Sequence, residues 1–206
     1  MVGQRLRTPI QYCPLFLRSD CLRIYIASSF KDNVLLKYRD LATEVADALA
    51  KEGHKLVFGG YDTGMMGKTY MAFKYESART KAIVDIKNTD ILSSLEVDAY
   101  DVTTNAMQRI EKAYKSSQVC LILPGGIETL AEFFTFVDEV RMHKSDVRII
   151  LFNYEHFFSP IINFLKNAYK ENFVSERELK LFDIVTDINS LNLYLYNLEK
   201  RFKEDD

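Results

Sequence analysis

The chain has 206 residues, 48% of them hydrophobic, and is therefore long enough to form one domain with a large core. Its formal net charge of −2 gives no basic surface for nucleic acid, so no nucleic-acid partner is expected. No apolar run approaches the roughly 18 residues that cross a bilayer, and the N-terminus has no clean signal-peptide core. These properties predict a cytoplasmic protein without a membrane partner.

Cysteine and histidine usage argues against disulfides and metal centres. The cysteines are an odd, widely spaced set, which is typical of reduced thiols rather than of a disulfide framework. The histidines have neither zinc-ligand spacing nor cysteine neighbours, so no metal site is predicted. The residues concerned are Cys13, Cys21, Cys120, His54, His143 and His156.

Residues 1–20 are predicted to form an N-terminal arm, because Pro9 and Pro14 bracket a segment without sustained periodicity. Residues 21–206 contain no repeat, low-complexity segment or linker, and we expect them to form a single domain.

Short apolar segments alternate with helical stripes through this domain, which predicts a single-domain α/β fold with a Rossmann-like, doubly wound parallel sheet flanked by helices. The expected strands are at residues 22–27, 54–58, 82–86, 97–102, 119–123, 147–152 and 182–185. The expected helices lie within residues 33–53, 68–79, 104–115, 127–142, 158–169 and 191–202.

The turn at residues 124–126 joins a wholly apolar strand to a helix. Its sequence, Pro-Gly-Gly, ends the strand, and an apolar stripe at helical spacing begins at Ile127. The free N–H groups and partial positive charge of such a helix start attract anions. Glu132 lies one turn into the helix, so we expect its carboxylate beside a bound phosphate or sugar.

A second glycine-rich stretch, GGYDTGMMG at residues 59–67, follows the predicted strand 54–58. It is not a dinucleotide fingerprint, which belongs in the first strand–helix turn, where this chain has Ser28 and Ser29 but no glycine. It is not a Walker loop either, because Asp62 stands where the first glycine of that pattern is needed. Ligands of doubly wound sheets bind beyond the carboxyl ends of the strands, so both glycine turns should converge there.

Together the two glycine turns resemble the signatures of the LOG family, cytokinin riboside 5′-monophosphate phosphoribohydrolases once described as lysine decarboxylases. Residues 59–67 are similar to the family pattern GGGxxGLMG, and residues 124–132, PGGIETLAE, are similar to PGGxGTxxE. The resemblance covers about residues 22–200. It implies a Rossmann-like homodimer that hydrolyses the N-glycosidic bond of AMP or an N6-substituted AMP, without a cofactor, to free base and ribose 5-phosphate.

The resemblance also implies roles for individual residues. Glu132 would be the catalytic carboxylate that stabilises charge on the sugar or orients water. Arg109 would keep Glu132 ionised and bind phosphate or ribose. The bland alternatives are an exposed glutamate at a helix start and a solvated arginine. The implied ligand-binding residues are Gly125, Gly126 and Thr129 at the phosphate, Gly60, Gly64 and Gly67 in the second loop, and Ser28 and Ser29 in the first turn.

Four features depart from the family pattern. Tyr61 replaces a glycine where a ligand would approach, and Ile110 replaces the lysine that follows Arg109 in the family. Glu128 replaces a glycine of the second signature. Residues 139–148 match only poorly the W-x-Q-x-G-x-H-x-K-P run of the family. The expected phosphate site thus loses a cation and gains a carboxylate.

Glu128 permits three interpretations. It points outward, or it pairs with a cation such as Arg109, Arg141 or one from a partner subunit, or it binds ribose hydroxyls of a ligand without a 5′-phosphate. Like charges four residues apart on an exposed helix repel by ~0.2–0.5 kcal/mol, so Glu128 also acts on Glu132. Together with Ile110, it favours the third interpretation somewhat.

The leading hypothesis is therefore a nucleotide N-glycosidase, with two alternatives: a nucleosidase that does not need the 5′-phosphate, and a nucleotide- or nucleoside-binding protein that has lost hydrolysis. Nothing marks a pyridoxal-phosphate lysine, so lysine decarboxylation is not expected. Aromatic residues of the later helices supply either a homodimer interface or core packing; they are Phe133, Phe134, Phe136, Phe157 and Phe158.

Overall fold

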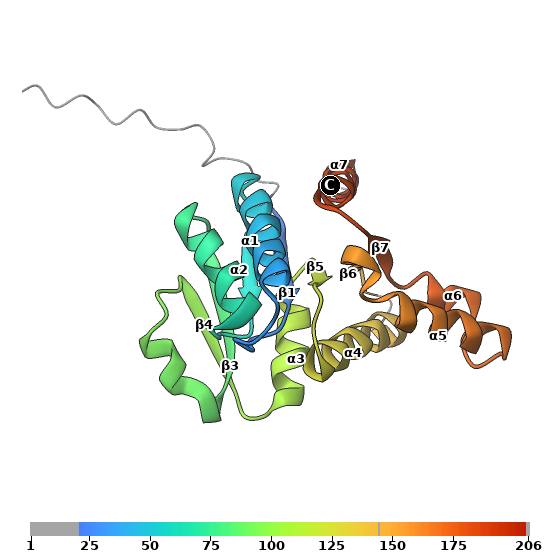
Figure 1. The fold of residues 1–206 in the computed structure, drawn as a ribbon, viewed down its shortest axis with the longest axis horizontal. Helices are drawn as coiled ribbons and strands as arrows, with labels where there is room; N and C mark the ends of the chain where they lie inside the picture. The colour runs from blue at the N-terminus through green and yellow to red at the C-terminus, as the bar shows by residue number, and fades with distance from the viewer. Residues whose placement is uncertain (1–20, 144, 205–206) are drawn as a thin grey trace, which may run out of the picture.

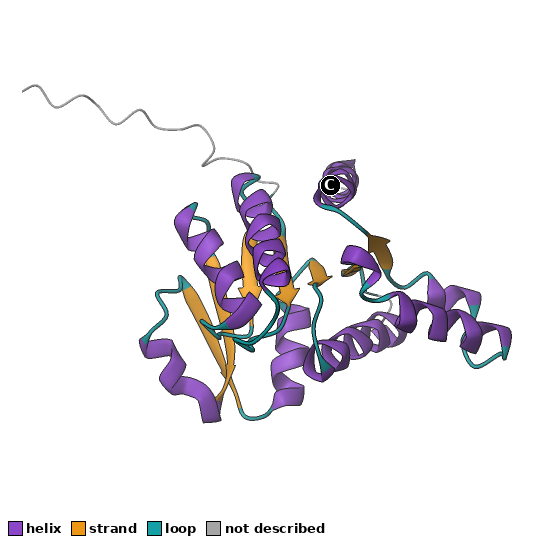
Figure 2. Cartoon of the chain, in the orientation of Figure 1, coloured by secondary structure: helices purple, strands orange, loops and turns teal. Residues whose placement is uncertain are grey.

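A computed structural model describes residues 21–143 and 145–204 of the chain. These residues form one sheet of seven parallel strands with helices on both faces (Figures 1 and 2). The predicted α/β fold with a doubly wound parallel sheet is confirmed. The predicted N-terminal arm, residues 1–20, lies outside the described residues.

The seven strands are separated by helices in almost strict alternation. The strands are β1 (Arg23–Ala27), β2 (Lys55–Phe58), β3 (Thr80–Asp85), β4 (Ala99–Thr103), β5 (Val119–Ile122), β6 (Arg148–Phe152) and β7 (Asp183–Val185). The helices are α1 (Leu36–Lys51), α2 (Gly64–Tyr75), α3 (Ala106–Lys115), α4 (Ile127–His143), α5 (Ser159–Lys170), α6 (Glu176–Leu179) and α7 (Ile188–Glu204), with 3₁₀ turns η2 (Ile86–Ser93) and η3 (Tyr154–His156).

The alternation of side chains along the central strands divides the core into two layers. On β1, Ile24 and Ile26 pack on the face covered by α1, α2 and α7, whereas Tyr25 and Ala27 pack on the face covered by α3, α4 and α5. Strands that are buried on both faces are wholly apolar, and β5 is the clearest case. Figure 1 shows α1 and α2 together on one side of the sheet and α3 and α4 on the other.

Strand β1 lies at the point where the winding of the sheet reverses. The strand order is β4-β3-β2-β1-β5-β6-β7, so the chain winds outward from β1 to β4 and then returns to β5 on the other side of β1. The connection after β1 leads to α1 on one face, and the connection after β5 leads to α4 on the opposite face. A crevice opens between two such connections, and this is where ligands bind in doubly wound sheets.

The structure corrects several predicted boundaries. Helix α2 begins at Gly64, inside the stretch that was expected to be a loop, because Gly67 N–H already bonds to the carbonyl of Thr63. Strand β3 begins at Thr80, two residues before the expected start, because the backbone N–H of Thr80 donates to the carboxylate of Asp98. Three short elements were not predicted at all: the 3₁₀ turns η2 and η3, and helix α6.

The aromatic residues divide between core and surface. Phe133, Phe136 and Phe158 are buried in the core, whereas Phe134 and Phe157 are 40% and 38% exposed. Cys120 is buried with a free thiol and Cys21 is partly buried, whereas Cys13 lies outside the described residues. Within residues 21–143 and 145–204, no helix is both long enough and apolar enough to cross a membrane.

Candidate functional site

A cleft of about 370 Å³ opens at the carboxyl edge of the sheet, between the connections that follow β1 and β5. Its position is the one that the reversal of the winding predicts. Ser29, Gly125 and Gly126, all predicted site residues, lie in its wall. The full lining is Ser29, Lys31, Asn33, Val34, Leu35, Tyr38, Pro124, Gly125, Gly126 and Phe157.

The turn at residues 124–126 contains one glycine that close contacts require, Gly125, and one that they do not, Gly126. A Cβ on Gly125 would lie 2.1 Å from Oγ1 of Thr129, so Thr129 fills the space that this glycine leaves empty. A Cβ on Gly126 would meet nothing nearer than Oε2 of Glu128, 3.8 Å away. Gly126 is exposed and lines the cleft, and its bare backbone can therefore approach a ligand closely.

Beneath this edge, three polar side chains form a buried cluster: Tyr25 of β1, Arg109 of α3 and Glu132 of α4. The Arg109 guanidinium donates to Glu132 Oε1 at 2.7 Å, and the Tyr25 hydroxyl donates to the same oxygen at 2.9 Å. Arg109 also donates to the Tyr25 hydroxyl at 3.2 Å. Glu132 is 4% exposed, so the alternatives of an exposed glutamate and a solvated arginine are wrong.

The charges of the cluster fix its protonation. Burial, reinforced by the negative charge of Glu132, raises the pKa of Tyr25 far above its ordinary range, so the phenol remains a hydrogen-bond donor. Burial by itself would lower the pKa of Arg109, but Tyr25 and Glu132 outweigh it and the pKa is raised. Burial, with a contribution from Glu132, also raises the pKa of the nearby Cys120 thiol, which therefore stays neutral.

The cluster and the cleft are joined through helix α4. Thr129 is buried against Gly125 of the cleft wall and lies three residues before Glu132, hence on the same helix face. Both hydrogen bonds to Glu132 reach Oε1, and Oε2 accepts none from the residues that the structure describes. One carboxylate oxygen is thus held by protein, and the other has no donor among the described residues; Glu132 itself is not part of the cleft lining.

The second glycine loop supports the site from the side. A Cβ on Gly59 would lie 3.3 Å from Nη1 of Arg109, so this loop passes directly beside the cluster. Gly60 has φ +83°, and its Cβ would lie 2.3 Å from Cγ1 of Val84. A Cβ on Gly67 would lie 2.0 Å from the carbonyl oxygen of Asp62. Gly60 and Gly67 therefore meet the protein's own atoms, and their ligand contacts remain a prediction.

The same loop fixes the connection that follows β1. Gly64, at φ +60°, leaves no room for a Cβ, which would lie 2.5 Å from the backbone carbon of Phe30. Its N–H donates to Asp32 at 3.0 Å, and the Thr63 hydroxyl donates to the Phe30 carbonyl at 2.7 Å. Gly64 thus helps to position the cleft wall rather than meeting the cleft directly.

The four departures from the family pattern have visible consequences. Tyr61 stacks on Phe30 with ring centroids 4.5 Å apart, and its hydroxyl accepts a hydrogen bond from Asn88, so the ring is held by protein. Ile110 is buried in the core on the α3 side of the sheet. Residues 139–148, which match the family run poorly, contain the end of α4 at His143 and the start of β6 at Arg148.

Glu128 is exposed in the first turn of α4. Neither predicted cation reaches it, because Arg109 pairs with Glu132 and Arg141 pairs with Asp138. Its Oε2 nevertheless stays near Gly126, on the rim of the cleft. Of the three interpretations of Glu128, an outward-pointing side chain agrees best with the described residues, although its carboxylate still borders the cleft.

Sequence reasoning missed several contributors to the site, among them Tyr25 in the cluster, and Lys31 and Tyr38 in the cleft wall. A tyrosine in an otherwise apolar strand was a usable signal, because a buried phenol needs a hydrogen-bond partner. Ser28, a predicted ligand-binding residue, is 4% exposed, and its hydroxyl has no hydrogen-bond partner among the described residues. No cluster of three or more metal-ligating side chains occurs in the described part of the chain.

Comparison of the sequence with known proteins identifies its family. The family model described as "Possible lysine decarboxylase" matches residues 45–195. The rice protein "Probable cytokinin riboside 5'-monophosphate phosphoribohydrolase LOGL3" is 26% identical over 141 residues, which is 67% of this chain and 66% of that protein. A second rice relative, "Probable cytokinin riboside 5'-monophosphate phosphoribohydrolase LOGL2", is 24% identical over 66% of this chain, and the match spans 57% of its own length. The Arabidopsis thaliana enzyme "Cytokinin riboside 5'-monophosphate phosphoribohydrolase LOG1" is 25% identical over 74% of this chain and 71% of its own.

Solved structures with the same fold include molybdenum cofactor proteins. The molybdenum cofactor carrier protein of Chlamydomonas reinhardtii superposes with a TM-score of 0.64 at 18% identity, covering 86% of this chain and 98% of its own. The molybdenum cofactor binding protein of Rippkaea orientalis gives 0.63 at 19% identity, covering 86% and 97%. At these identities the likeness establishes the fold alone.

The matched residues 45–195 make up most of the chain and contain both glycine turns, Arg109 and Glu132. This chain is therefore a divergent member of the LOG family, whose model carries the description "Possible lysine decarboxylase".

Proposed function

We propose that this protein hydrolyses the N-glycosidic bond of a nucleoside 5′-monophosphate, AMP or an N6-substituted AMP, and releases the free base and ribose 5-phosphate. The named activity of the LOG relatives supports the reaction class. The observation that carries the proposal is the buried Arg109–Glu132–Tyr25 cluster behind a cleft with a glycine-walled helix start. A buried carboxylate with one free oxygen suits the stabilisation of a positively charged sugar.

In the proposed reaction, water adds its hydroxyl group to C1′ of the ribose while the bond from C1′ to the base nitrogen breaks. The base leaves with the bond's electron pair and takes the remaining proton of the water. Positive charge builds on the sugar in the transition state, and the Glu132 carboxylate would stabilise it or orient the water through Oε2. Arg109 and Tyr25 hold Oε1, so the carboxylate is oriented before the substrate binds.

Binding without hydrolysis is the second candidate, and the buried Ile110 favours it. Arg109 is the one cation of the buried cluster, and its guanidinium is already paired with Glu132. Two proteins with this fold are named as a carrier and a binding protein for molybdenum cofactor. Ligand binding without turnover is therefore a distinct outcome that the experiment must resolve.

Incubation of the protein with matched nucleosides and nucleoside monophosphates, followed by chromatographic detection of free base, tests the proposal. We expect base release from AMP or its N6-substituted analogues. Base release from adenosine at the same rate would point to a nucleosidase that does not need the phosphate. Binding in calorimetry with no base from any member of the panel would establish the second candidate.

We further propose that two copies of the chain associate in the cytoplasm through the aromatic surface near α4 and α5. Phe134 of α4 is 40% exposed and Phe164 of α5 is 63% exposed. Light scattering on the eluting protein should give twice the chain mass, and a monomer at micromolar concentration would exclude this association.

A further inference from the structure

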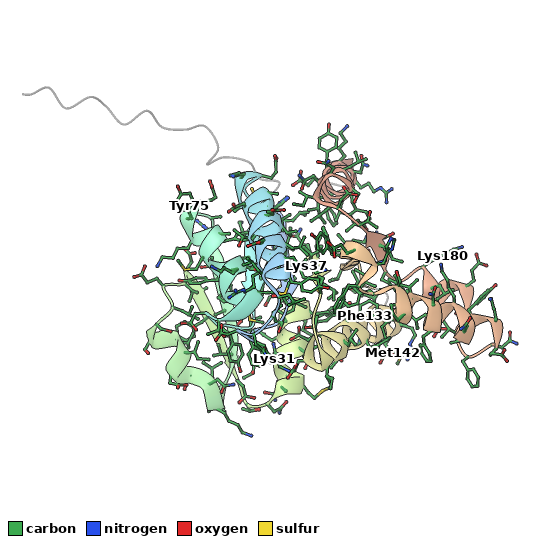
Figure 3. The ribbon with its side chains drawn as sticks, in the orientation of Figure 1. Lys31, Lys37, Tyr75, Phe133, Met142 and Lys180 are labelled. Carbon is green, nitrogen blue, oxygen red and sulfur yellow. The ribbon has the colours of Figure 1, made fainter. Side chains whose placement is uncertain are left out.

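The cleft wall contains a cation that the sequence comparison did not indicate. Lys31, which Figure 3 labels, lies in the connection that follows β1. It lines the same cleft as Gly125 and Gly126. Its ammonium forms no ion pair with any of the described residues, whereas Lys37, six residues later, is paired with Glu155. A lysine that is exposed at a cleft and unpaired is available to an anionic ligand.

The backbone that carries Lys31 is held in place from several directions. Its own N–H donates to the Ser29 hydroxyl at 3.2 Å, and the Ser29 carbonyl accepts from the N–H of Met66 at 3.1 Å. Gly64 packs against the Phe30 and Lys31 backbone so closely that its Cβ would lie 2.7 Å from the Lys31 carbonyl oxygen. The backbone at Lys31 is therefore held at a defined place in the cleft wall, from which the exposed side chain extends.

The charge of the site also needs a second cation. Ile110 is buried where the resembling family has a lysine, so no cation can act from that position. Arg109 is committed to Glu132, and Glu128 adds a negative charge at the rim. Ser29, close to Lys31 in the chain, lines the same cleft, so the connection after β1 also brings a hydroxyl to this wall.

We propose that Lys31 binds the 5′-phosphate of the ligand against the start of α4, in place of the cation that Ile110 removes. Lys31 thereby makes the cleft selective for nucleoside monophosphates over nucleosides. This inference rests on the proposed function for the identity of the ligand, but the phosphate contact can be measured without catalysis.

The experiment is calorimetric titration of the whole chain with ribose 5-phosphate, which carries the phosphate but has no base to lose. We expect Lys31→Gln to weaken binding at least about tenfold, because it removes a charge-assisted contact. Lys166→Gln, which removes an equal charge from an exposed lysine of α5, should change binding less than about twofold. Glu128→Gln should strengthen binding, and added salt should weaken binding to the unmodified chain more than to Lys31→Gln.

Equal affinity of the unmodified chain and Lys31→Gln would overturn the proposal, and so would the absence of binding at millimolar ribose 5-phosphate. Melting curves check that each variant folds; Lys31 is exposed, so little change is expected. Lys31-dependent binding with no base released from AMP would leave this inference standing and remove the glycosidase. Base release from AMP together with binding that does not depend on Lys31 would support the glycosidase and overturn the assignment of the phosphate to Lys31.

Discussion

At the scale of single residues, the central feature is a carboxylate buried with its partners. Burying the Glu132 charge is unfavourable unless it is paired and hydrogen-bonded, and Arg109 and Tyr25 both converge on one of its oxygens. Three elements that lie far apart in sequence, β1, α3 and α4, supply these groups. The arrangement keeps Glu132 in one orientation and leaves Oε2 free of protein donors among the described residues.

Replacement of Tyr25 by Phe removes one donor to Glu132 and leaves the ring. We expect kcat for base release to fall about tenfold with KM changed less than about twofold, because a hydrogen bond to a charged group is lost while the cleft wall is untouched. Steady-state kinetics with AMP measures both constants. The ring's edge-to-face contact with Phe136, at 5.4 Å between centroids, should preserve the fold.

Tyr114→Phe is the matched control for this change. It removes a phenol from the same core layer without touching Glu132. If both variants lower kcat equally, or if Tyr25→Phe raises KM instead, the hydroxyl of Tyr25 does not position the carboxylate.

The residues of the cluster were only partly predictable. Arg109 and Glu132 follow from the motifs, but 23 positions separate them, and no pattern in the sequence says that their side chains meet. Tyr25 is read from its strand as one more core residue, since alternation reports which face a side chain takes and not what its hydroxyl touches. Lys31 was missed because a charged residue in a turn looks the same whether it borders a cleft or bulk water.

At the scale of elements, the turn between β5 and α4 depends on two glycines with different tasks. Gly125→Ala should lower the free energy of unfolding by ~1–3 kcal/mol, because its Cβ would lie 2.1 Å from Oγ1 of Thr129. Gly126→Ala should change it by less than about 0.5 kcal/mol, because the nearest atom is 3.8 Å away. Urea unfolding of the two variants measures the contrast.

Equal destabilisation by the two alanines would show that the turn adapts and that Thr129 does not lock it. Gly126→Ala should instead weaken ribose 5-phosphate binding, since its methyl group would lie at the cleft wall. Replacement of Gly125 would then affect mainly stability, and replacement of Gly126 mainly ligand binding.

Boundaries of elements were less predictable than their existence. Helix α2 begins within the glycine-rich stretch because Gly64 and Gly67 fit a helix start that packs on the loop after β1, a tertiary contact that local sequence does not reveal. Helix α6 is only four residues long and is held by the Ser175–Glu178 capping box, which a search for apolar periodicity passes over.

At the scale of the whole molecule, alternation of apolar strands and helical stripes was sufficient to predict the parallel, doubly wound sheet. The order of its strands was not predictable in the same way, because β1 pairs with both β2 and β5 through contacts distant in sequence. That order matters for function, since it places the cleft between the connections after β1 and β5.

The stability of the whole fold should depend on pH through His54, which joins the sheet to α7. It is buried, its Nδ1 accepts the N–H of Leu22 at 3.3 Å, and the Glu199 carboxylate lies 3.6 Å away. Burial lowers the pKa of His54 from 6.5 to about 4. The unfolded chain therefore binds more protons between these values, and stability should fall by up to ~3 kcal/mol as the pH drops through this interval.

His54→Asn retains an acceptor for the Leu22 N–H but cannot titrate. Urea unfolding at a series of pH values should show a shallower loss of stability between pH 6.5 and about 4 in this variant than in the unmodified chain. Parallel curves for the two proteins would show that His54 is not the group responsible.

The most direct test of the central claim is free-base release from AMP by the unmodified chain and by Glu132→Gln. Glutamine keeps the size of the side chain and an oxygen for Arg109, but it removes the negative charge. We expect the unmodified chain to release adenine and Glu132→Gln, folded by its melting curve, to lose at least about a hundredfold in kcat. Equal rates for the two proteins would contradict the assignment of Glu132 as the catalytic carboxylate.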